Sequence, residues 1–156
     1  MIVIEMENGK TMEIELDYKA APISAANFEK LVRDGFYDGL TFHRVIPGFV
    51  IQGGDPLGNG MGGSEETIKG EFLSNGYDNP LKHERGVLSM ARAQDPDSAS
   101  SQFFICHADV PYLDGGYAAF GRVVSGLETL DEIANCETGF MDRPVKKQVM
   151  KRVYIK

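Results

Sequence analysis

The sequence lacks several features that would define a class at once. None of its apolar runs approaches the roughly 18 residues that a transmembrane helix requires. No positively charged segment followed by an apolar core opens the chain. These absences predict a soluble, cytoplasmic protein with no membrane partner. The 156 residues can bury a substantial core but are too few for two ordinary domains, so we expect residues 1–156 to form a single domain.

Positive charge is also scarce. Lysine and arginine together number 16 against 23 aspartates and glutamates, which gives a formal net charge of -7, and the acidic residues are spread along the chain. Proteins that bind a phosphate backbone present a basic stripe, so nucleic acid is not an expected partner. The negative charge and the lack of an obvious apolar stripe predict a monomer.

Residues for metal, thiol or nucleophilic chemistry are few. The two cysteines, Cys106 and Cys136, form no C-x-x-C motif and are interpreted as reduced thiols. Neither G-x-S-x-G nor H-E-x-x-H is present. His43, His83 and His107 are far apart in sequence and lie beside apolar strand residues, so each is interpreted as structural. We therefore expect no metal and no cofactor.

Short strands are what the sequence does contain. Residues 1–17 alternate apolar and acidic side chains around Asn8-Gly9, which predicts an antiparallel hairpin with a type I′ turn. Further strand patterns cover residues 41–46, 49–52, 86–92 and 101–106, and a final strand is predicted from the alternation of Val149, Lys151, Val153 and Ile155. Many short strands with few helices favour a closed or nearly closed antiparallel barrel.

Two helices are predicted to cover the ends of this barrel. The first begins at Pro22 and stops at Asp34-Gly35. The second begins at a capping box formed by Ser125 and Glu128. The side chains expected to face inward are Ile23, Ala26, Phe28, Leu31 and Val32 in the first helix and Leu127, Leu130 and Ile133 in the second.

The glycine-rich residues 55–70 are interpreted as a surface loop. Gly58, Gly60 and Gly63 formally satisfy G-x-G-x-x-G. The dinucleotide-binding form of this motif needs a helix directly after it, whereas Glu65-Glu66 follow here and would repel a phosphate. We therefore reject a nucleotide site.

The stretch FHRVIPGFVIQGGD, residues 42–55, places one arginine among apolar side chains. Two strands are separated by Pro47-Gly48, and alternation puts Val50 and Gln52 on one face and Phe49 and Ile51 mainly on the other. Arg44 is either a fixed donor beside an apolar surface or the snorkelling arginine of an ordinary core hairpin. In residues 101–106 Gln102 and Phe104 likewise share a face.

An arginine, two glutamines and apolar side chains can bind and orient a ligand, but they have little means of transferring protons or acyl groups. Rotation about an X-Pro bond makes and breaks no covalent bond, and its barrier of about 18–20 kcal/mol arises because the twisted amide loses its resonance. A site that only binds and orients can therefore catalyse it. A guanidinium that donates to the prolyl nitrogen acts mainly in the twisted transition state, and such differential binding raises the rate.

Four blocks, FHRVIPGFVIQGGD, GVLSMARA, SQFFI and YLDGGYAAFG, resemble in order and spacing the signature blocks of the cyclophilin family of peptidyl-prolyl isomerases. The resemblance covers essentially the whole chain and is closest to the short single-domain bacterial members. It implies a mainly β fold, an eight-stranded closed antiparallel barrel capped by two α-helices, with the site on the outer face. It also implies a rotamase that acts on X-Pro bonds of unfolded or flexible polypeptides and assists folding without a cofactor.

The resemblance assigns roles to particular positions. Arg44 is similar to the catalytic arginine of the family, and Gln52 to the glutamine that holds the substrate backbone and helps to orient that arginine. The expected proline pocket consists of Phe49, Val50, Phe104 and Leu113. The expected groove for the residues before proline consists of Ala91, Arg92, Ala93 and Gln102.

Three positions depart from the common pattern of the family. Val50 stands where methionine is usual, Tyr117 where histidine is frequent, and Tyr112 where many members have the tryptophan linked to cyclosporin binding. Catalysis is expected to survive, since the arginine and the phenylalanines remain. Cyclosporin is expected to bind with weakened affinity, because tyrosine need not replace the indole N–H donor.

Two other hypotheses stay open on the sequence. The chain could be a non-catalytic module that binds proline peptides in a chaperone-like or scaffolding role. It could also be a structural barrel in which Arg44 is an ordinary surface residue.

Overall fold

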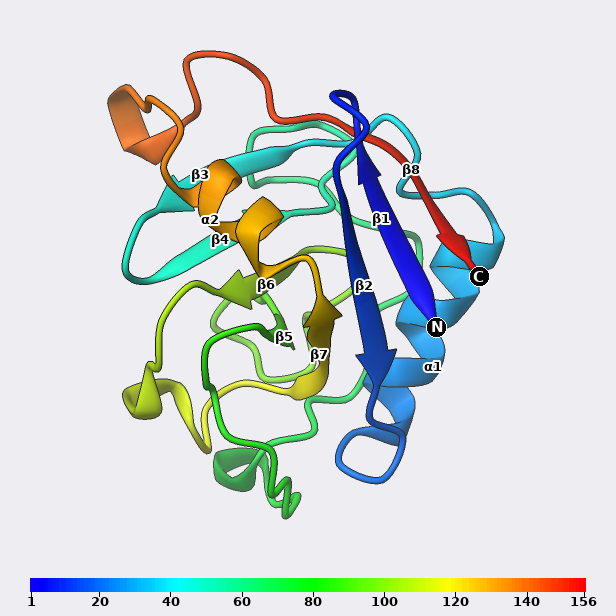
Figure 1. The fold of residues 1–156 in the computed structure, drawn as a ribbon. Helices are drawn as coiled ribbons and strands as arrows, with labels where there is room; N and C mark the ends of the chain where they lie inside the picture. Colours follow the sequence, from blue (N-terminus) through cyan, green and yellow to red (C-terminus); the bar gives the residue numbers. More distant parts are fainter.

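The eight strands of the protein form one antiparallel sheet, described for all 156 residues by a computed structural model (Figure 1). The order across the sheet is β3-β4-β6-β5-β7-β2-β1-β8. No helix combines the length and the apolar character needed to cross a bilayer. The strands are β1 (Ile2–Met6), β2 (Thr11–Leu16), β3 (Phe42–Ile46), β4 (Val50–Gly53), β5 (Val87–Met90), β6 (Phe103–Cys106), β7 (Ala119–Ser125) and β8 (Met150–Ile155).

The sheet is so strongly curled that its two end strands meet. The amide of Phe42 donates to the carbonyl of Gln148 at 3.0 Å, and the amide of Met150 donates to the carbonyl of Leu40 at 2.8 Å. Between them lies an isolated bridge of Thr41 and Val149. The predicted mainly β, eight-stranded antiparallel barrel is confirmed, and its closure consists of this short stretch between β3 and β8.

Two helices, α1 (Pro22–Arg33) and α2 (Leu127–Ala134), pack against the curled sheet (Figure 1). Both contribute to one inner core of 27 buried residues, to which α1 supplies Phe28 and α2 supplies Leu130. The ring of Phe28 lies 5.1–5.2 Å from the rings of Tyr37, Phe103 and Phe120. Three 3-10 turns complete the elements: η1 (Leu73–Asn75), η2 (Pro111–Leu113) and η3 (Phe140–Asp142). Because the interior is filled by side chains, a ligand site must lie outside it.

The extent of α1 was predicted correctly, and Phe28, Leu31 and Val32 are buried as predicted, but the prediction was wrong in the first turns of the helix. Ile23 is 44% exposed and Ala26 is exposed, whereas Ser24 and Ala25 are buried. The buried carboxylate of Glu71 accepts hydrogen bonds from the amides of Ile23 at 3.0 Å and Ser24 at 2.6 Å. This carboxylate fixes the first turn with Ser24 inward, so the buried stripe runs through Ser24 rather than Ile23.

The capping box predicted for α2 is wrong. Ser125 ends β7, and Gly126 occupies the N-cap position with φ 97° and no side-chain cap. A Cβ atom at Gly126 would lie 2.3 Å from the carbonyl of Thr11, so the close approach of β2 requires glycine here. Leu127, predicted inward, is 36% exposed.

The first hairpin is present, but its turn is not type I′. Gly9 has φ 84°, and Asn8 is not among the residues with positive φ. The amide of Gly9 donates to the carbonyl of Met6, whose own amide donates to the carbonyl of Lys10, both at 2.9 Å. This is a three-residue loop with a left-handed glycine bulge. The Asn8 side chain accepts from the amide of Lys10 at 2.9 Å and stabilises the longer loop.

The last strand is confirmed, but its alternation is interrupted. Met150 pairs with Met6 and Arg152 pairs with Glu5, so Lys151 is the extra residue of a bulge. Met150 and Val153 are therefore the buried residues, while Ile155 is 36% exposed.

Candidate active site

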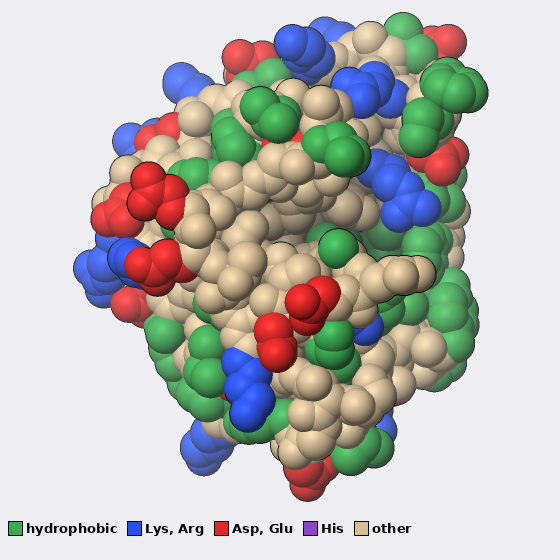
Figure 2. Space-filling view, turned by 180° about the vertical axis from the view of Figure 1, so that it is seen from behind, with side chains coloured by type: hydrophobic (Ala, Val, Ile, Leu, Met, Phe, Trp, Pro, Cys, Tyr) green, Lys and Arg blue, Asp and Glu red, His purple; other side chains and the backbone are tan.

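A cavity of about 570 Å³ lies on the outer side of the sheet. The side chains of its apolar wall belong to an outer cluster, separate from the inner core, whose buried members are Val50, Val87, Phe104, Cys106, Val110 and Ala119. Figure 2 shows that the surface is hollowed on the side opposite to the view of Figure 1, with apolar, basic and acidic side chains around the hollow. Nine of the twelve predicted site residues line the cavity: Arg44, Phe49, Val50, Gln52, Ala91, Arg92, Phe104, Leu113 and Tyr117.

The apolar wall of the cavity is aromatic and rigidly packed. Phe104 is 5% exposed and Val50 is 2% exposed, and the ring of Tyr117 meets that of Phe104 edge-on at 5.7 Å. Phe49 lies in this wall beside Val50, although alternation put it with Ile51 on the opposite face. Phe49 precedes β4 and belongs to the turn, where the two-residue period does not apply.

A chain of side-chain amides holds the arginine over this wall. Arg44 pairs with Gln52 across β3 and β4, and its Nη1 donates to Gln52 Oε1 at 3.4 Å. Gln52 Nε2 donates to Gln102 Oε1 at 3.0 Å, and Gln102 Nε2 donates to the carbonyls of Gly60 at 3.0 Å and Gly62 at 2.8 Å. Arg44 makes no ion pair with a carboxylate and no other side-chain hydrogen bond, so its remaining donors are free for a ligand.

The remaining groove residues line a second cavity of about 240 Å³ that adjoins the first. Ala93 and Gln102 lie in its wall, and Gln52, Gly60, Ala91 and Arg92 line both cavities. Arg92 also connects several parts of the site. Its guanidinium lies 4.7 Å from the ring centroid of Phe72 and 4.8 Å from that of Tyr117, and its Nη2 donates to the carbonyl of Gly116 at 2.7 Å.

Tyr112 is the one predicted site residue that lines neither cavity. Its side chain is 74% exposed, and its ring stacks on that of Phe49 at 6.1 Å and 14°. The structure therefore places Tyr112 at the rim, behind Phe49.

Six residues line the main cavity that the sequence did not indicate: His43, Asn59, Gly60, Met141, Asp142 and Arg143. His43 reaches it because a bulge between Phe42 and Arg44 turns two consecutive side chains outward. Burial lowers the pKa of His43, as do Arg143 and Arg44, while Asp55 opposes them. The imidazole beside Arg44 is therefore neutral near pH 7.

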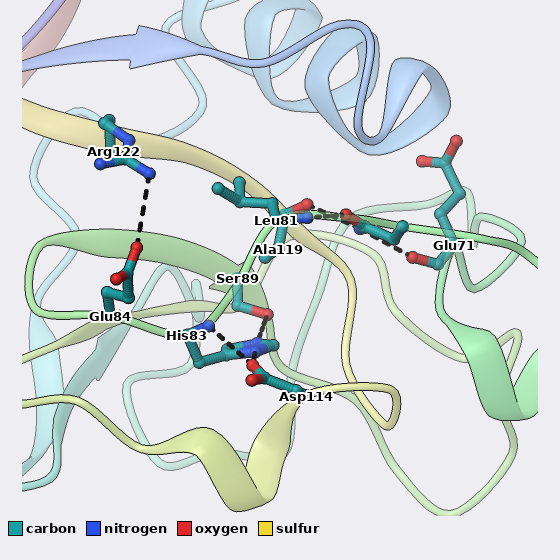
Figure 3. A network of polar contacts seen from close by, with 9 residues as sticks. Glu71, Leu81, His83, Glu84, Ser89, Asp114, Ala119 and Arg122 are labelled. Atoms are coloured by element: carbon teal, nitrogen blue, oxygen red, sulfur yellow. Dashed lines mark hydrogen bonds and ion pairs between the residues drawn. The ribbon is translucent and has the colours of Figure 1, made fainter.

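Behind the apolar wall, His83 lies between buried Ser89 and partly exposed Asp114, and the three side chains are drawn in Figure 3. His83 Nδ1 is 2.8 Å from Asp114 Oδ1, and His83 Nε2 is 2.8 Å from Ser89 Oγ. Ser89 is fully buried, so its hydroxyl cannot act as a nucleophile. The imidazole stacks on the ring of Phe104 at 6.0 Å, so the three residues support the wall and anchor the loop that carries Leu113.

The outer cluster contains one cysteine, Cys106. Burial raises the pKa of Cys106 to about 12, so the thiol is inert. No group of three or more His, Cys, Asp or Glu side chains is arranged to hold a metal ion.

The fold and the cavity together define a class of protein, an antiparallel barrel with a cavity on its outer wall that is lined by aromatic side chains and by a guanidinium without a carboxylate partner. A sequence profile described as "Cyclophilin type peptidyl-prolyl cis-trans isomerase/CLD" matches residues 1–155. The chain therefore belongs to the cyclophilin-type peptidyl-prolyl cis-trans isomerase family, and it is a peptidyl-prolyl isomerase.

Individual relatives agree with this assignment. Peptidyl-prolyl cis-trans isomerase B of Bacillus subtilis is 55% identical over 130 residues, which cover 83% of this chain and 87% of the relative. A peptidyl-prolyl cis-trans isomerase of Helicobacter pylori is 49% identical over 128 residues, which cover 81% of this chain and 76% of the relative. The crystal structure of a Cryptosporidium parvum cyclophilin was determined in the presence of the dipeptide Ala-Pro. It matches this chain with a TM-score of 0.90 and 35% sequence identity, and the match covers 99% of this chain and 98% of that one.

Proposed function

We propose that this isomerase acts at the Arg44 cavity on X-Pro bonds of unfolded or flexible polypeptides and thereby assists protein folding. The observation that carries the proposal is a guanidinium with no carboxylate partner, held by Gln52 over an apolar wall. The Ala-Pro dipeptide used with the Cryptosporidium parvum relative supports an X-Pro ligand for this cavity.

In this proposal the pyrrolidine ring packs on Phe49, Phe104 and Leu113, while Arg44 faces the prolyl nitrogen. In the planar amide the nitrogen lone pair is delocalised, and it accepts a hydrogen bond only when the amide twists. The hydrogen bond therefore strengthens on the way to the transition state, where about 1.4 kcal/mol is worth a factor of ten in rate. Gln52 fixes the direction of the guanidinium and binds the substrate backbone.

The residues before proline are proposed to lie in the second cavity, along Ala91, Arg92, Ala93 and Gln102. That cavity adjoins the first through Gln52, so an extended peptide can enter both at once. Cyclosporin is proposed to bind with weakened affinity, because Tyr112 supplies no indole N–H at the rim. We also propose that the protein works as a monomer in the cytoplasm, and its two free cysteines are compatible with a reducing compartment.

Substitution of Arg44 tests the mechanism. Arg44→Ala removes one preorganised donor, and we expect isomerisation to slow by about 10²–10³-fold, the usual cost of losing such a donor. Exchange NMR on X-Pro peptides measures the rate, and Arg122→Ala, at an exposed position of β7, serves as the control. Unchanged activity in a folded Arg44→Ala variant would refute the mechanism. If the variant still binds proline peptides and keeps its effect on folding clients, the function is binding rather than catalysis.

A further inference from the structure

Met141 differs from every other apolar residue of the main cavity. The cavity has seven hydrophobic lining residues, and six of them belong to the outer cluster or pack against it: Phe49, Val50, Ala91, Phe104, Leu113 and Tyr117. Met141 does neither, because it comes from η3, which lies beside β3. The cavity therefore has a second apolar surface, separate from the wall proposed to hold the proline ring.

The segment that carries Met141 is held in place by hydrogen bonds. Residues 137–145 form a small hairpin in which the amide of Gly139 donates to the carbonyl of Arg143 at 2.8 Å and that of Val145 to Glu137 at 2.9 Å. Arg143 Nη1 donates to the carbonyl of Gly58 at 3.1 Å, which ties the hairpin to the loop after β4. The position of Met141 at the cavity is therefore fixed from two directions.

The backbone at the tip of this hairpin is strained. Met141 has φ 59° and Asp142 has φ 60°, and they are the only non-glycine residues of the chain with positive φ. Side chains other than those of Asn and Asp rarely adopt this conformation. Strained backbone persists where the surrounding structure enforces it, and it is concentrated at functional sites.

The side chain of Met141 is also mostly exposed. It is 74% exposed although it lines the cavity, and it belongs to neither the inner core nor the outer cluster. A flexible thioether at the mouth of a binding site suits contact with apolar ligand groups of varied shape.

The layout of the cavities indicates which part of the substrate reaches Met141. At about 570 Å³ the main cavity is within the roughly 300–1,000 Å³ typical of ligand sites, and it holds more than one pyrrolidine ring. The second cavity, proposed for the residues before proline, has none of residues 141–143 in its wall. The end of the main cavity at Met141 is therefore left for the residue that follows proline.

We propose that Met141 is a specificity residue that selects substrates with a large apolar residue immediately after proline. The proposal rests on the proposed function, since it uses the same cavity and the same direction of the peptide. The neighbouring charges do not favour another class of residue. Asp142 and Arg143 carry opposite charges, and Arg143 is engaged with the carbonyl of Gly58.

A peptide series tests this proposal. Peptides Ala-Ala-Pro-Xaa with Phe, Leu, Gly or Asp at Xaa are followed by exchange NMR, without a coupling protease that would impose its own preference. We expect kcat/KM for Phe to exceed that for Gly by about tenfold or more, the usual effect of one added apolar contact. Met141→Asn tolerates positive φ and should bring the ratio close to one. Phe140→Asn, in the same hairpin but outside the cavity and 88% exposed, should keep it.

Each alternative outcome overturns the proposal in a different way. Equal rates for Phe and Gly in the natural sequence, or a preference that survives Met141→Asn, would contradict it while leaving the isomerase function intact. A preference for Asp that disappears in Arg143→Gln would assign selection to charge instead. If no peptide is isomerised, the proposed function fails. Contact of the peptide with Met141 is then tested separately by the NMR shift of the Met141 methyl group, whose resonance is assigned by its loss in Met141→Asn. A larger shift with the Phe peptide than with the Gly peptide supports the contact, and equal shifts reject it.

Discussion

Replacement of His83 by leucine is expected to weaken the support behind Phe104 in the apolar wall of the cavity. Leucine has a similar size but removes both ring hydrogen bonds, each 2.8 Å long. Ser89 is fully buried and would be left without a partner for its hydroxyl, at a cost of about 1–3 kcal/mol. Asp114 still accepts the hydrogen bond from the backbone amide of residue 83 and stays partly exposed to solvent. Loss of its hydrogen bond to the ring therefore costs about 0.5–1.5 kcal/mol of stability.

Together these terms predict that His83→Leu lowers the free energy of unfolding by roughly 1.5–4.5 kcal/mol, out of a typical 5–15 kcal/mol. Urea unfolding at pH 7.5 measures the loss. The double variant with Ser89→Ala removes both partners and should recover part of it, because no buried hydroxyl is then orphaned. A loss below 1 kcal/mol, or a double variant less stable than His83→Leu, would refute the reasoning.

The same residue predicts a dependence of stability on pH. Burial lowers the pKa of His83, against the opposing hydrogen bond and charge of Asp114. A histidine whose pKa is lower in the folded state makes its full contribution above the unfolded pKa of about 6.5, and this contribution is lost as the pH falls below that value. Unfolding at pH 5.5 should therefore cost less free energy than at pH 7.5, and His83→Leu should reduce the difference. An equal difference in the variant would contradict this assignment.

Two further predictions concern residues outside the cavity. Glu71→Gln replaces a buried carboxylate that accepts from the amides of α1 and from Ser24 Oγ, and we expect it to destabilise the protein by about 1–3 kcal/mol in urea unfolding. An unchanged midpoint would show that the carboxylate does not hold the helix. Native protein should react with a thiol reagent at Cys136 only, since Cys106 is buried with a pKa of about 12. Two fast equivalents in mass spectrometry would contradict this.

The alternation of apolar and polar residues predicted much of the fold, because most strands bury one face and expose the other. The same rule brought Gln52 and Phe104 to the cavity. It failed at His43, where a bulge inserts a residue, and at Phe49, which lies in a turn. A bulge depends on the pairing of two distant strands, and no local pattern encodes it.

Residues 141–143 could not be predicted from the sequence for a different reason. They lie about a hundred positions beyond Arg44, in a hairpin with neither helical nor strand periodicity, and tertiary hydrogen bonds bring them to the cavity. The two left-handed residues at its tip carry no glycine signal, since they are methionine and aspartate. In the structure Met141 and Asp142 are distinguished by their positive φ, which no local sequence pattern indicates.

The position of the site follows from the way β3, β4 and β6 are buried on both faces. Val45, Ile51 and Phe103 point into the inner core, while Arg44, Gln52 and Phe104 point outward from the same strands. Because successive side chains alternate, a slip of one residue would exchange the two sets and bury the arginine in the core. The packing of the interior therefore fixes the register that places Arg44 opposite Gln52. The reaction that we propose at Arg44 depends on orientation rather than on proton transfer, so it needs a donor that is fixed before the substrate arrives, and the tightly packed interior supplies that rigidity.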